Sequence, residues 1–177
     1  CDYAVLAGNA YVHGIAPELD SKIMPVGTYI GASEPLGEAA ASALIKNDMA
    51  VADINWALDY FRLSADHRIL FGGRASYSTL QPPNLRSVMT SRMTRVFPQL
   101  KNIKFDYIWG GYVDISLNRA PHWGRLGSNI YFAQGFSGHG IAATGLAGRI
   151  IGEAIRGQAS RLDVFEKIKH LPFPGGR

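Results

Sequence analysis

Residues 129–157 read NIYFAQGFSGHGIAATGLAGRIIGEAIRG, and this stretch decides which folds the chain can adopt. It opens with Asn129 to Gln134, an apolar run typical of a buried β-strand. A glycine-rich turn, Gly135 to Gly140, follows directly, and Ile141 to Arg156 then has the composition of a helix that Gly157 would end. The stretch therefore predicts a strand, a tight turn and a helix in immediate succession.

The turn is suited to binding an anionic or electron-rich group. Glycine permits positive φ angles and lets a ligand approach the backbone without meeting a Cβ atom. The first turn of the following helix has N–H groups without intrahelical partners and lies at the positive end of the helix dipole. Ser137 or His139 is also placed to cap this helix. These features predict a ligand site at the start of the helix.

The helix also has an unusual face of small residues. Each glycine inside a helix costs up to about 1 kcal/mol relative to alanine. Such a cost is expected where a neighbouring strand or a cofactor packs close to the helix axis, whereas Arg149, Glu153 and Arg156 argue against a membrane-spanning seam. The small face consists of Ala142, Ala143, Gly145, Ala147, Gly148 and Gly152.

Three interpretations of the turn are open. Gly138 to Ala143 matches the dinucleotide pattern G-x-G-x-x-A, but no second strand ending in an acidic residue follows, as a primary dinucleotide motif requires. The unit is therefore expected to be the last of its domain. Gly135 and Ser137 begin the serine-hydrolase pattern G-x-S-x-G, which fails because His139 stands where the second glycine is needed. A purely structural turn is the third interpretation.

The remainder of the chain predicts a sheet covered by helices. Leu58–Leu63 and Arg68–Gly72 form a hairpin, and the apolar residues of Asn84–Phe97 recur at helical spacing, so this helix is expected to cover a sheet. Three further segments read as strands: Tyr3–Ala7, expected to be buried, Lys22–Ser33, expected to be bulged or at an edge, and Lys104–Tyr112. A short helix is expected over Glu38–Ile45, and Leu171–Arg177 reads as a loose tail.

Composition argues against several classes of protein. The 177 residues are 47% hydrophobic and 18% charged, so a packed core is expected. The formal charge of +4 is carried by scattered basic residues, which argues against nucleic-acid binding. No apolar run is long enough to cross a membrane, no histidine pair has zinc-ligand spacing, and the single cysteine, Cys1, suits the cytoplasm. A core strand directly after Cys1-Asp2, without an initiator methionine, suggests a fragment.

Four stretches in register resemble one known family. Tyr131–Ala142 (YFAQGFSGHGIA) resembles the carboxy-terminal flavin segment of the D-amino-acid oxidase/sarcosine oxidase (DAO) superfamily, and the chain is most similar to its γ-glutamylputrescine oxidase-like branch. Val5–Ala10 (VLAGNA) resembles the strand end that returns to the cofactor. Pro25–Leu36 resembles the crossing into the substrate domain, and Arg68–Gly73 (RILFGG) resembles a strand of that domain. The resemblance covers nearly the whole chain.

The resemblance implies an α+β fold derived from an α/β architecture. Residues 21–107 would form a substrate-binding domain, a mixed β-sheet with helices on one face. Residues 1–20 and 108–166 would supply the remaining strands and the last helix of a truncated FAD-binding domain, and residues 167–177 a tail. The main G-x-G-x-x-G motif of the superfamily and its acidic ribose partner are absent from the sequence. The chain thus resembles the carboxy-terminal part of a FAD-dependent oxidoreductase.

Residue by residue, the resemblance implies flavin contacts and an amine pocket. The cofactor-binding residues are expected to be Gly8, Gly110, Gly111, Gly135, Ser137, Gly138, His139, Gly140 and Ile141, and the walls of the pocket Trp109, Tyr112 and Phe136. FAD would be non-covalent, because this chain has Gly111 near the position where some relatives attach it through a cysteine. Ala142 stands where sarcosine oxidases often have a lysine that binds substrate carboxylate. No catalytic base and no metal ligand is assigned.

The activity implied is the oxidation of an amine or amino acid at its C–N bond to an imine, which then hydrolyses, with FAD as electron acceptor. The fragment itself is expected to hold FAD weakly or not at all, to be inactive, and to self-associate through its exposed cofactor face. The expected partner is a small-molecule amine or amino acid, with no nucleic acid and no membrane. The alternative is a non-enzymatic ligand-binding or interaction module whose glycine-rich turn is structural.

Overall fold

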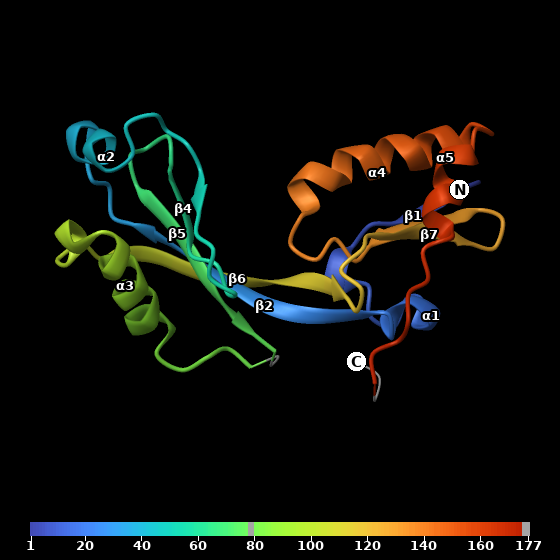
Figure 1. The fold of residues 1–177 in the computed structure, drawn as a ribbon, viewed down its shortest axis with the longest axis horizontal. Helices are drawn as coiled ribbons and strands as arrows, with labels where there is room; N and C mark the ends of the chain where they lie inside the picture. Colours follow the sequence, from blue (N-terminus) through green and yellow to red (C-terminus); the bar gives the residue numbers. More distant parts are fainter. Residues whose placement is uncertain (78–79, 175–177) are drawn as a thin grey trace. The chain divides into compact units, whose positions relative to one another are not determined.

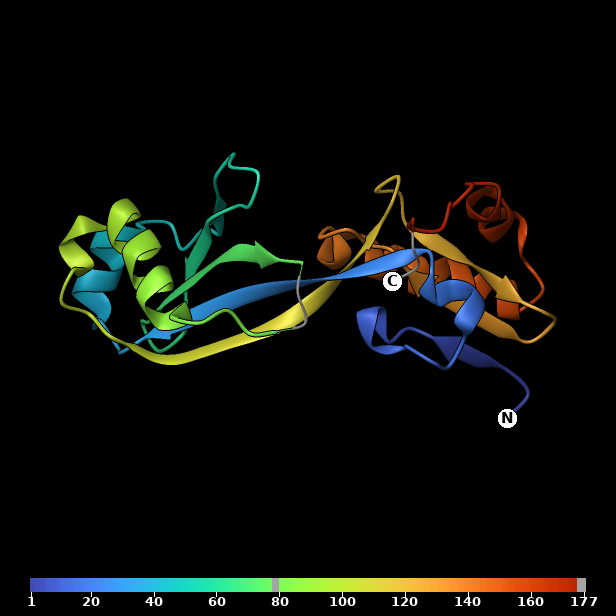
Figure 2. The ribbon, with the colours of Figure 1, turned by 90° about the horizontal axis from the view of Figure 1, so that it is seen from below.

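The computed structural model describes residues 1–77 and 80–174, and the chain divides into two compact units (Figures 1 and 2). Unit 1 comprises Cys1–Val26 and Tyr112–Arg177, and unit 2 comprises Gly27–Gly111. Two long strands, β2 (Ile23–Ser33) and β6 (Phe105–Ser116), contribute residues to both units. Among the described residues, no helix combines the length and the hydrophobicity needed to span a bilayer.

Unit 1 contains a small sheet in the order β1-β8-β7. Strand β1 (Ala4–Leu6) runs parallel to β8 (Ile130–Gln134), and β7 (His122–Leu126) runs antiparallel to β8. Because parallel strands end at the same edge, the segments that follow β1 and β8 leave the sheet side by side. The helices of the unit are η1 (Asn9–Tyr11), α1 (Pro17–Asp20), α4 (Gly140–Ile155) and α5 (Ser160–Glu166).

The core of unit 1 lies between the sheet and α4, which runs along one face of it (Figure 1). The buried positions of α4 are Ala147, Ile150, Ile151 and Ala154, a spacing that places them on one stripe of a helix. They pack with Tyr131 and Ala133 of β8, with Trp123 of β7 and with Leu162 of α5. The predicted succession of strand, turn and helix is therefore confirmed.

Strand β1 is less buried than the sequence predicted. Val5 is 46% exposed and Tyr3, just before the strand, is 47% exposed. Within the described residues β1 pairs only with β8, so its other edge is unpaired. The prediction of a buried strand at this position is wrong for the chain as it stands, because a strand at the edge of a sheet has one open side.

The carboxy-terminal segment is held against unit 1 and is not loose over its described part. The Asn118 side-chain amide donates to the Lys169 carbonyl (3.0 Å), and the Phe173 N–H donates to the Ser21 carbonyl (2.8 Å). The ring of His170 stacks on that of His122 with 4.1 Å between centroids. Residues 175–177 of the predicted tail lie outside the described residues.

Unit 2 is built on a sheet in the order β3-β4-β5-β2-β6. Strands β3 (Val51–Ala52), β4 (Tyr60–Leu63) and β5 (Ile69–Ser76) pair in antiparallel fashion, as does β5 with β2, so the predicted hairpin is confirmed. Strand β2 lies inside the sheet, which excludes the edge position considered for it. Its register shifts between Thr28 and Tyr29, as a bulge requires.

Two helices, α2 (Glu38–Leu44) and α3 (Leu85–Val96), cover the sheet of unit 2. The buried residues of α3, Leu85, Met89 and Met93, recur every four positions and pack with Ile69 and Phe71 of β5 in one hydrophobic cluster. Ala41 of α2 joins the same cluster. The fold class predicted from the sequence, α+β with helices against a sheet, is confirmed.

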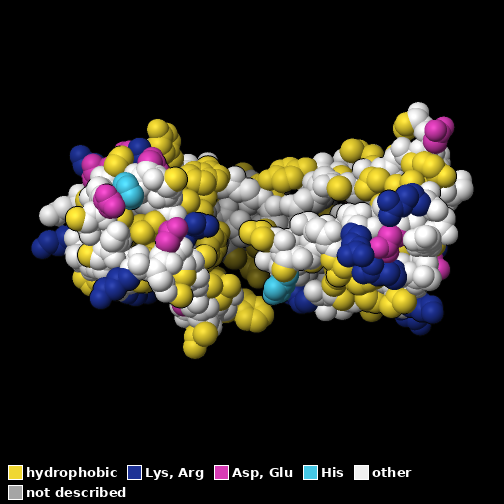
Figure 3. All heavy atoms as spheres, turned by 90° about the horizontal axis from the view of Figure 1, so that it is seen from above, with side chains coloured by type: hydrophobic (Ala, Val, Ile, Leu, Met, Phe, Trp, Pro, Cys, Tyr) yellow, Lys and Arg dark blue, Asp and Glu magenta, His cyan; other side chains and the backbone are white. Residues whose placement is uncertain are grey.

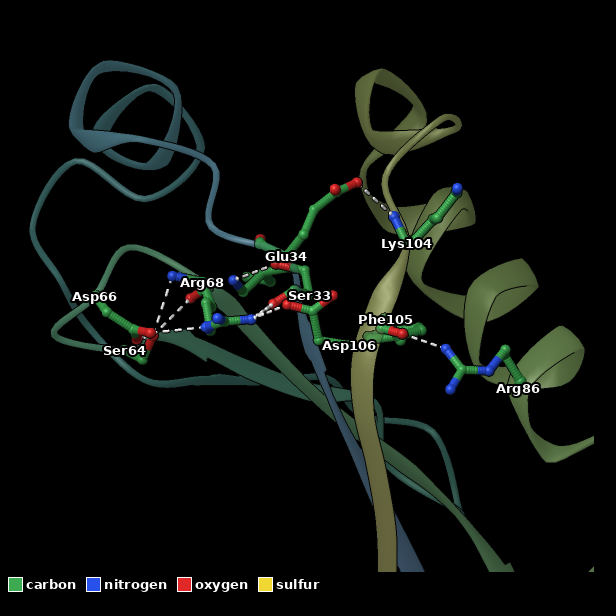
Figure 4. A network of polar contacts seen from close by, with 10 residues as sticks. Ser33, Glu34, Ser64, Asp66, Arg68, Arg86, Lys104, Phe105 and Asp106 are labelled. Carbon is green, nitrogen blue, oxygen red and sulfur yellow. Dashed lines mark hydrogen bonds and ion pairs between the residues drawn. The ribbon is translucent and has the colours of Figure 1, made fainter.

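Arg68, the first residue of the RILFGG stretch, has a structural role in unit 2 (Figure 4). Its guanidinium donates to the Ser33 carbonyl (2.6 Å), to Asp66 (2.7 Å) and to Asp106. The hydrogen bonds to Asp106 and Asp66 raise the pKa of Arg68 above its ordinary value. The planar fork of arginine therefore links the starts of β5 and β6 to the end of β2.

Candidate functional site

The glycine-rich turn between β8 and α4 has an unusual backbone. Gly135, Ser137 and Gly138 have φ angles of +72°, +53° and +91°. Ser137 is therefore a non-glycine residue in the left-handed region, a conformation that costs roughly 1–2 kcal/mol. Its hydroxyl donates to the Gly135 carbonyl (3.2 Å) and accepts the Ser116 N–H (3.3 Å), so it faces β6.

Neither predicted side-chain cap is present on α4. The N-cap residue is His139, and its side chain makes no capping hydrogen bond. The Ser137 hydroxyl is engaged with β6 instead, because the positive φ angle turns the side chain away from the helix. Of the two predicted capping residues, His139 therefore occupies the N-cap position, but neither supplies a side-chain capping hydrogen bond.

The start of α4 therefore presents a row of N–H groups to a ligand. No described residue accepts a hydrogen bond from the N–H groups of Gly138, Gly140, Ile141 or Ala142, which we call the open amides. The His139 N–H is excluded from this row because it donates to the Phe136 carbonyl (2.9 Å). Ile141 is fully exposed, and a Cβ atom placed on Gly138 would meet nothing within 4 Å. The open amides can hold a negatively charged or electron-rich group.

Asp114 of β6 binds the backbone of the first half of the turn through hydrogen bonds. Its side chain is 1% exposed, and its carboxylate accepts the N–H groups of Gly135 and Phe136, the latter at 3.1 Å. Its carbonyl accepts the Ser137 N–H at 2.9 Å. Burial raises the pKa of Asp114, although its two backbone hydrogen bonds oppose the shift. From the sequence we did not assign Asp114 a role, yet an acidic residue inside an apolar strand needs buried partners.

Asn9, directly after Gly8, links the segment that follows β1 to β6 near Asp114. Its side chain donates to the Tyr112 carbonyl (2.6 Å) and accepts the Asp114 N–H (3.2 Å). The ends of β1, β6 and β8 thus meet around Asp114. Gly8 itself is exposed, and a Cβ atom there would lie 2.6 Å from Val12. The packing of Val12 therefore explains why position 8 is a glycine.

The residues predicted to wall an amine pocket have separate neighbours. Phe136 is half-buried and packs against Trp123, with ring centroids 6.0 Å apart, in the core under α4. The Tyr112 ring lies edge-on to that of Tyr11 at 5.9 Å. Trp109 belongs to unit 2 and is 48% exposed.

Gly110 and Gly111 also belong to unit 2. Close packing within this unit explains why residue 110 is a glycine. A Cβ atom on Gly110 would lie 2.7 Å from the Tyr29 ring and 3.2 Å from the Thr28 carbonyl oxygen. The Tyr29 ring of β2 therefore requires glycine at position 110, and a flavin contact of Gly110 or Gly111 stays a prediction.

The glycine face of α4 is open. Cβ atoms placed on Gly145, Gly148 and Gly152 would meet nothing within 4 Å, so no described strand packs close to the helix axis there. The other predicted reason for these glycines, a cofactor against this face, stays a prediction. Figure 3 is seen from the side of α4, where basic side chains gather around an acidic one among apolar and uncharged atoms. Among the described residues, no group of His, Cys, Asp or Glu side chains is arranged to hold a metal ion.

Comparison with protein families decides the identity of the fold. The model of the DAO family, described as FAD dependent oxidoreductase, matches residues 1–154. The chain belongs to this family. The resemblance predicted from the sequence is thereby confirmed, and the open amides fit a flavin because they supply N–H donors and positive potential with no side chain in front of Gly138.

Relatives of this DAO-family chain are longer proteins. It is 46% identical over 176 residues to gamma-glutamylputrescine oxidoreductase of Escherichia coli (strain K12), which covers 99% of this chain and 41% of the relative. It is 48% identical over 181 residues to the probable oxidoreductase OrdL of Haemophilus influenzae, which covers 98% of this chain and 40% of that protein. The chain therefore spans about two fifths of the length of these relatives.

Solved structures share the DAO fold at low sequence identity. Glycine oxidase from Geobacillus kaustophilus superimposes with a TM-score of 0.75 at 16% identity, covering 96% of this chain and 46% of that one. L-proline dehydrogenase from P. horikoshii superimposes with a TM-score of 0.69 at 21% identity, covering 86% of this chain and 42% of that one.

Proposed function

We propose that the full-length protein containing this chain oxidises the C–N bond of an amine or amino acid, and that the resulting imine is hydrolysed by water. FAD, bound non-covalently, would supply the two-electron acceptor. The single observation that carries the proposal is the row of open amides at the positive end of α4. Family membership supports the cofactor, and the name of the Escherichia coli relative supports an amine substrate.

The open amides would act on the flavin by electrostatics. Their N–H groups and the α4 dipole would hold the pyrimidine edge of the ring and favour the negative charge that this edge gains on reduction. The N–H contacts proposed for this edge are those of Gly138, Gly140 and Ile141. The N–H groups of Gly135, Ser137 and His139 already donate within the chain, so a contribution of these three residues to cofactor binding stays a prediction. The contribution of Gly8, Gly110 and Gly111 to cofactor binding, and that of Trp109, Tyr112 and Phe136 to an amine pocket, stay predictions.

Substrate choice is proposed from Ala142. It stands where sarcosine oxidases often have a lysine for the substrate carboxylate, so this chain lacks one anchor for a simple α-amino acid. An amine whose reacting carbon carries no carboxylate, as in a γ-glutamylated diamine, is therefore the preferred substrate class. The cytoplasm is the proposed compartment, because the chain has one cysteine and no internal disulfide.

The direct test uses the full-length protein with its flavin. We expect purified protein to show visible flavin absorbance, and anaerobic addition of a γ-glutamylated diamine to bleach it faster than addition of glycine or proline. Protein that contains no flavin, or flavin that no amine bleaches, would favour the non-enzymatic binding module with a structural turn.

Exchange of Ile141 tests the role of the open amides, because its fully exposed side chain leaves the core untouched. Ile141→Glu places a carboxylate in the first turn of α4, which should stabilise the flavin-free chain by roughly 0.3–1 kcal/mol. The same charge should weaken flavin binding and lower its reduction potential in the full-length protein. Ile141→Gln, the uncharged control of similar size, should change both quantities much less. A potential that is the same in the two variants would contradict the proposal.

For the chain of residues 1–177 alone, we propose weak flavin binding, no activity and self-association. The exposed side chains of Ile141 and Leu146 lie on the uncovered side of α4, where a second copy can remove apolar surface from water. Gel filtration over a range of concentrations should show an apparent mass that rises with concentration. Ile141→Lys should keep the chain monomeric to higher concentration, and an unchanged concentration dependence would exclude this face.

A further inference from the structure

The backbone N–H groups of the turn between β8 and α4 fall into two sets that differ in their hydrogen bonding. The inner set, from Gly135, Phe136 and Ser137, donates all of its hydrogen bonds to Asp114. The outer set consists of the open amides. Successive N–H groups around left-handed residues form a concave anion-binding site. Here the inner part of that concavity already contains a carboxyl group of the protein itself, that of Asp114.

We infer that Asp114 is a positioning residue, which fixes the turn so that the open amides are aimed at the flavin before it binds; this inference rests on the proposed function. A turn with φ angles of +72°, +53° and +91° is costly to maintain without external hydrogen bonds. The carboxylate of Asp114 satisfies two N–H groups and its carbonyl satisfies a third, so the conformation is stabilised from β6. Donors that are already oriented need no reorganisation when a charge develops.

The environment of Asp114 suits this role better than a role in proton transfer. The side chain is 1% exposed, and no described basic side chain forms an ion pair with it. Its strongest partners are backbone N–H groups, which cannot be displaced by side-chain motion. Asn9 supports it in turn by accepting the Asp114 N–H at 3.2 Å.

The test replaces Asp114 by Asn. One side-chain oxygen can accept one of the two N–H groups, but the new NH2 group faces the other, so one buried donor loses its partner. In the chain of residues 1–177, we expect amide hydrogen exchange at Gly135 or Phe136 to accelerate on the order of tenfold. In the full-length protein, the flavin dissociation constant should rise by a similar factor, and the visible flavin spectrum should shift.

A matched control separates positioning from general loss of stability. Asp59 is also buried, at 7% exposure, and pairs with Arg92 at 2.6 Å in unit 2. Asp59→Asn should lower the thermal midpoint but leave flavin affinity and spectrum as in the wild type. If Asp114→Asn does not fold, Asn9→Gly keeps the positive φ of residue 9, removes its amide and should weaken flavin binding to a smaller extent.

The outcomes distinguish this inference from the proposed function. Wild-type flavin affinity in Asp114→Asn, or an effect equal to that of Asp59→Asn, would overturn the positioning role. A wild-type full-length protein that binds no flavin would instead overturn the proposed function. The exchange rates at Gly135 and Phe136 would then still decide whether Asp114 organises the turn.

Discussion

At the scale of single residues, aromatic rings explain why glycine occupies strand positions of unit 2. Gly72 pairs directly with Tyr60 across β4 and β5, and a Cβ atom on Gly72 would lie 2.0 Å from that ring. Gly31 and Gly110 are covered in the same way by Phe105 and Tyr29. We therefore expect Gly72→Ala to destabilise the chain by about 1–3 kcal/mol, because the ring must move from its place.

A double-mutant cycle tests this explanation. In the Tyr60→Ala background the space above Gly72 is empty, and the cost of Gly72→Ala in urea denaturation should fall close to zero. The coupling between the two substitutions should then be about 0.5–3 kcal/mol. If the stability losses of Gly72→Ala and Tyr60→Ala are additive, the Tyr60 ring is not the reason why position 72 is a glycine.

At the scale of elements, α4 has glycines whose costs are not offset by close packing within the described chain. Gly148 lies inside the helix and a Cβ atom there would meet nothing within 4 Å. Gly148→Ala should therefore raise the free energy of unfolding of this chain by up to about 1 kcal/mol. The expected gain in thermal midpoint is roughly 2–4 °C for a chain of this size.

Gly157 provides the control for α4. Its position is equally open, but its φ angle is +87°, which alanine adopts only at a cost. Gly157→Ala should lower the stability by roughly 1–2 kcal/mol, so the two substitutions should have opposite signs. Equal effects at the two positions would contradict the assignment of Gly157 as the residue that ends the helix.

At the scale of the whole molecule, two stacked histidines make stability depend on pH. His122 is 8% exposed, and its Nδ1 accepts a hydrogen bond from the side-chain NH2 group of Gln134 (3.1 Å). Burial, with smaller contributions from His170 and Lys22, lowers the pKa of His122 to about 3. Burial, followed by Lys22, also lowers the pKa of His170. Both rings are therefore neutral in the folded chain at neutral pH.

The direction of the pH dependence follows from the unfolded state. An unfolded histidine binds a proton near pH 6.5, so the full stabilisation is present above this pH and is lost as the pH falls towards 3. Through His122 alone, the free energy of unfolding should fall by up to about 1.4 kcal/mol for each pH unit of acidification. Urea denaturation of the wild type and of His122→Gln across this range should show a flatter curve for the variant. Asp114, whose pKa is raised by burial, acts in the opposite direction, and the paired comparison removes its contribution.

Local patterns in the sequence were sufficient for much of the fold and for the place of the site. The hairpin of β4 and β5, the helix α3 and the strand–turn–helix of residues 129–157 all depend on hydrophobic periodicity and glycine chemistry over a few neighbouring residues. The family also followed from short motifs in register, and the family match confirms it. Short elements such as α1 and β7 carry too few residues for a periodic signal.

Only the tertiary structure decided how the turn is supported. Residues 114 and 135 are 21 positions apart, and β1 reaches its partner β8 across most of the chain, so no local pattern encodes either contact. Periodicity reports which residues are buried, whereas the partner of a buried carboxylate depends on how strands from distant parts of the chain meet. For this reason the sequence by itself located the turn, and the packing of β1, β6 and β8 determined which of its N–H groups remain open.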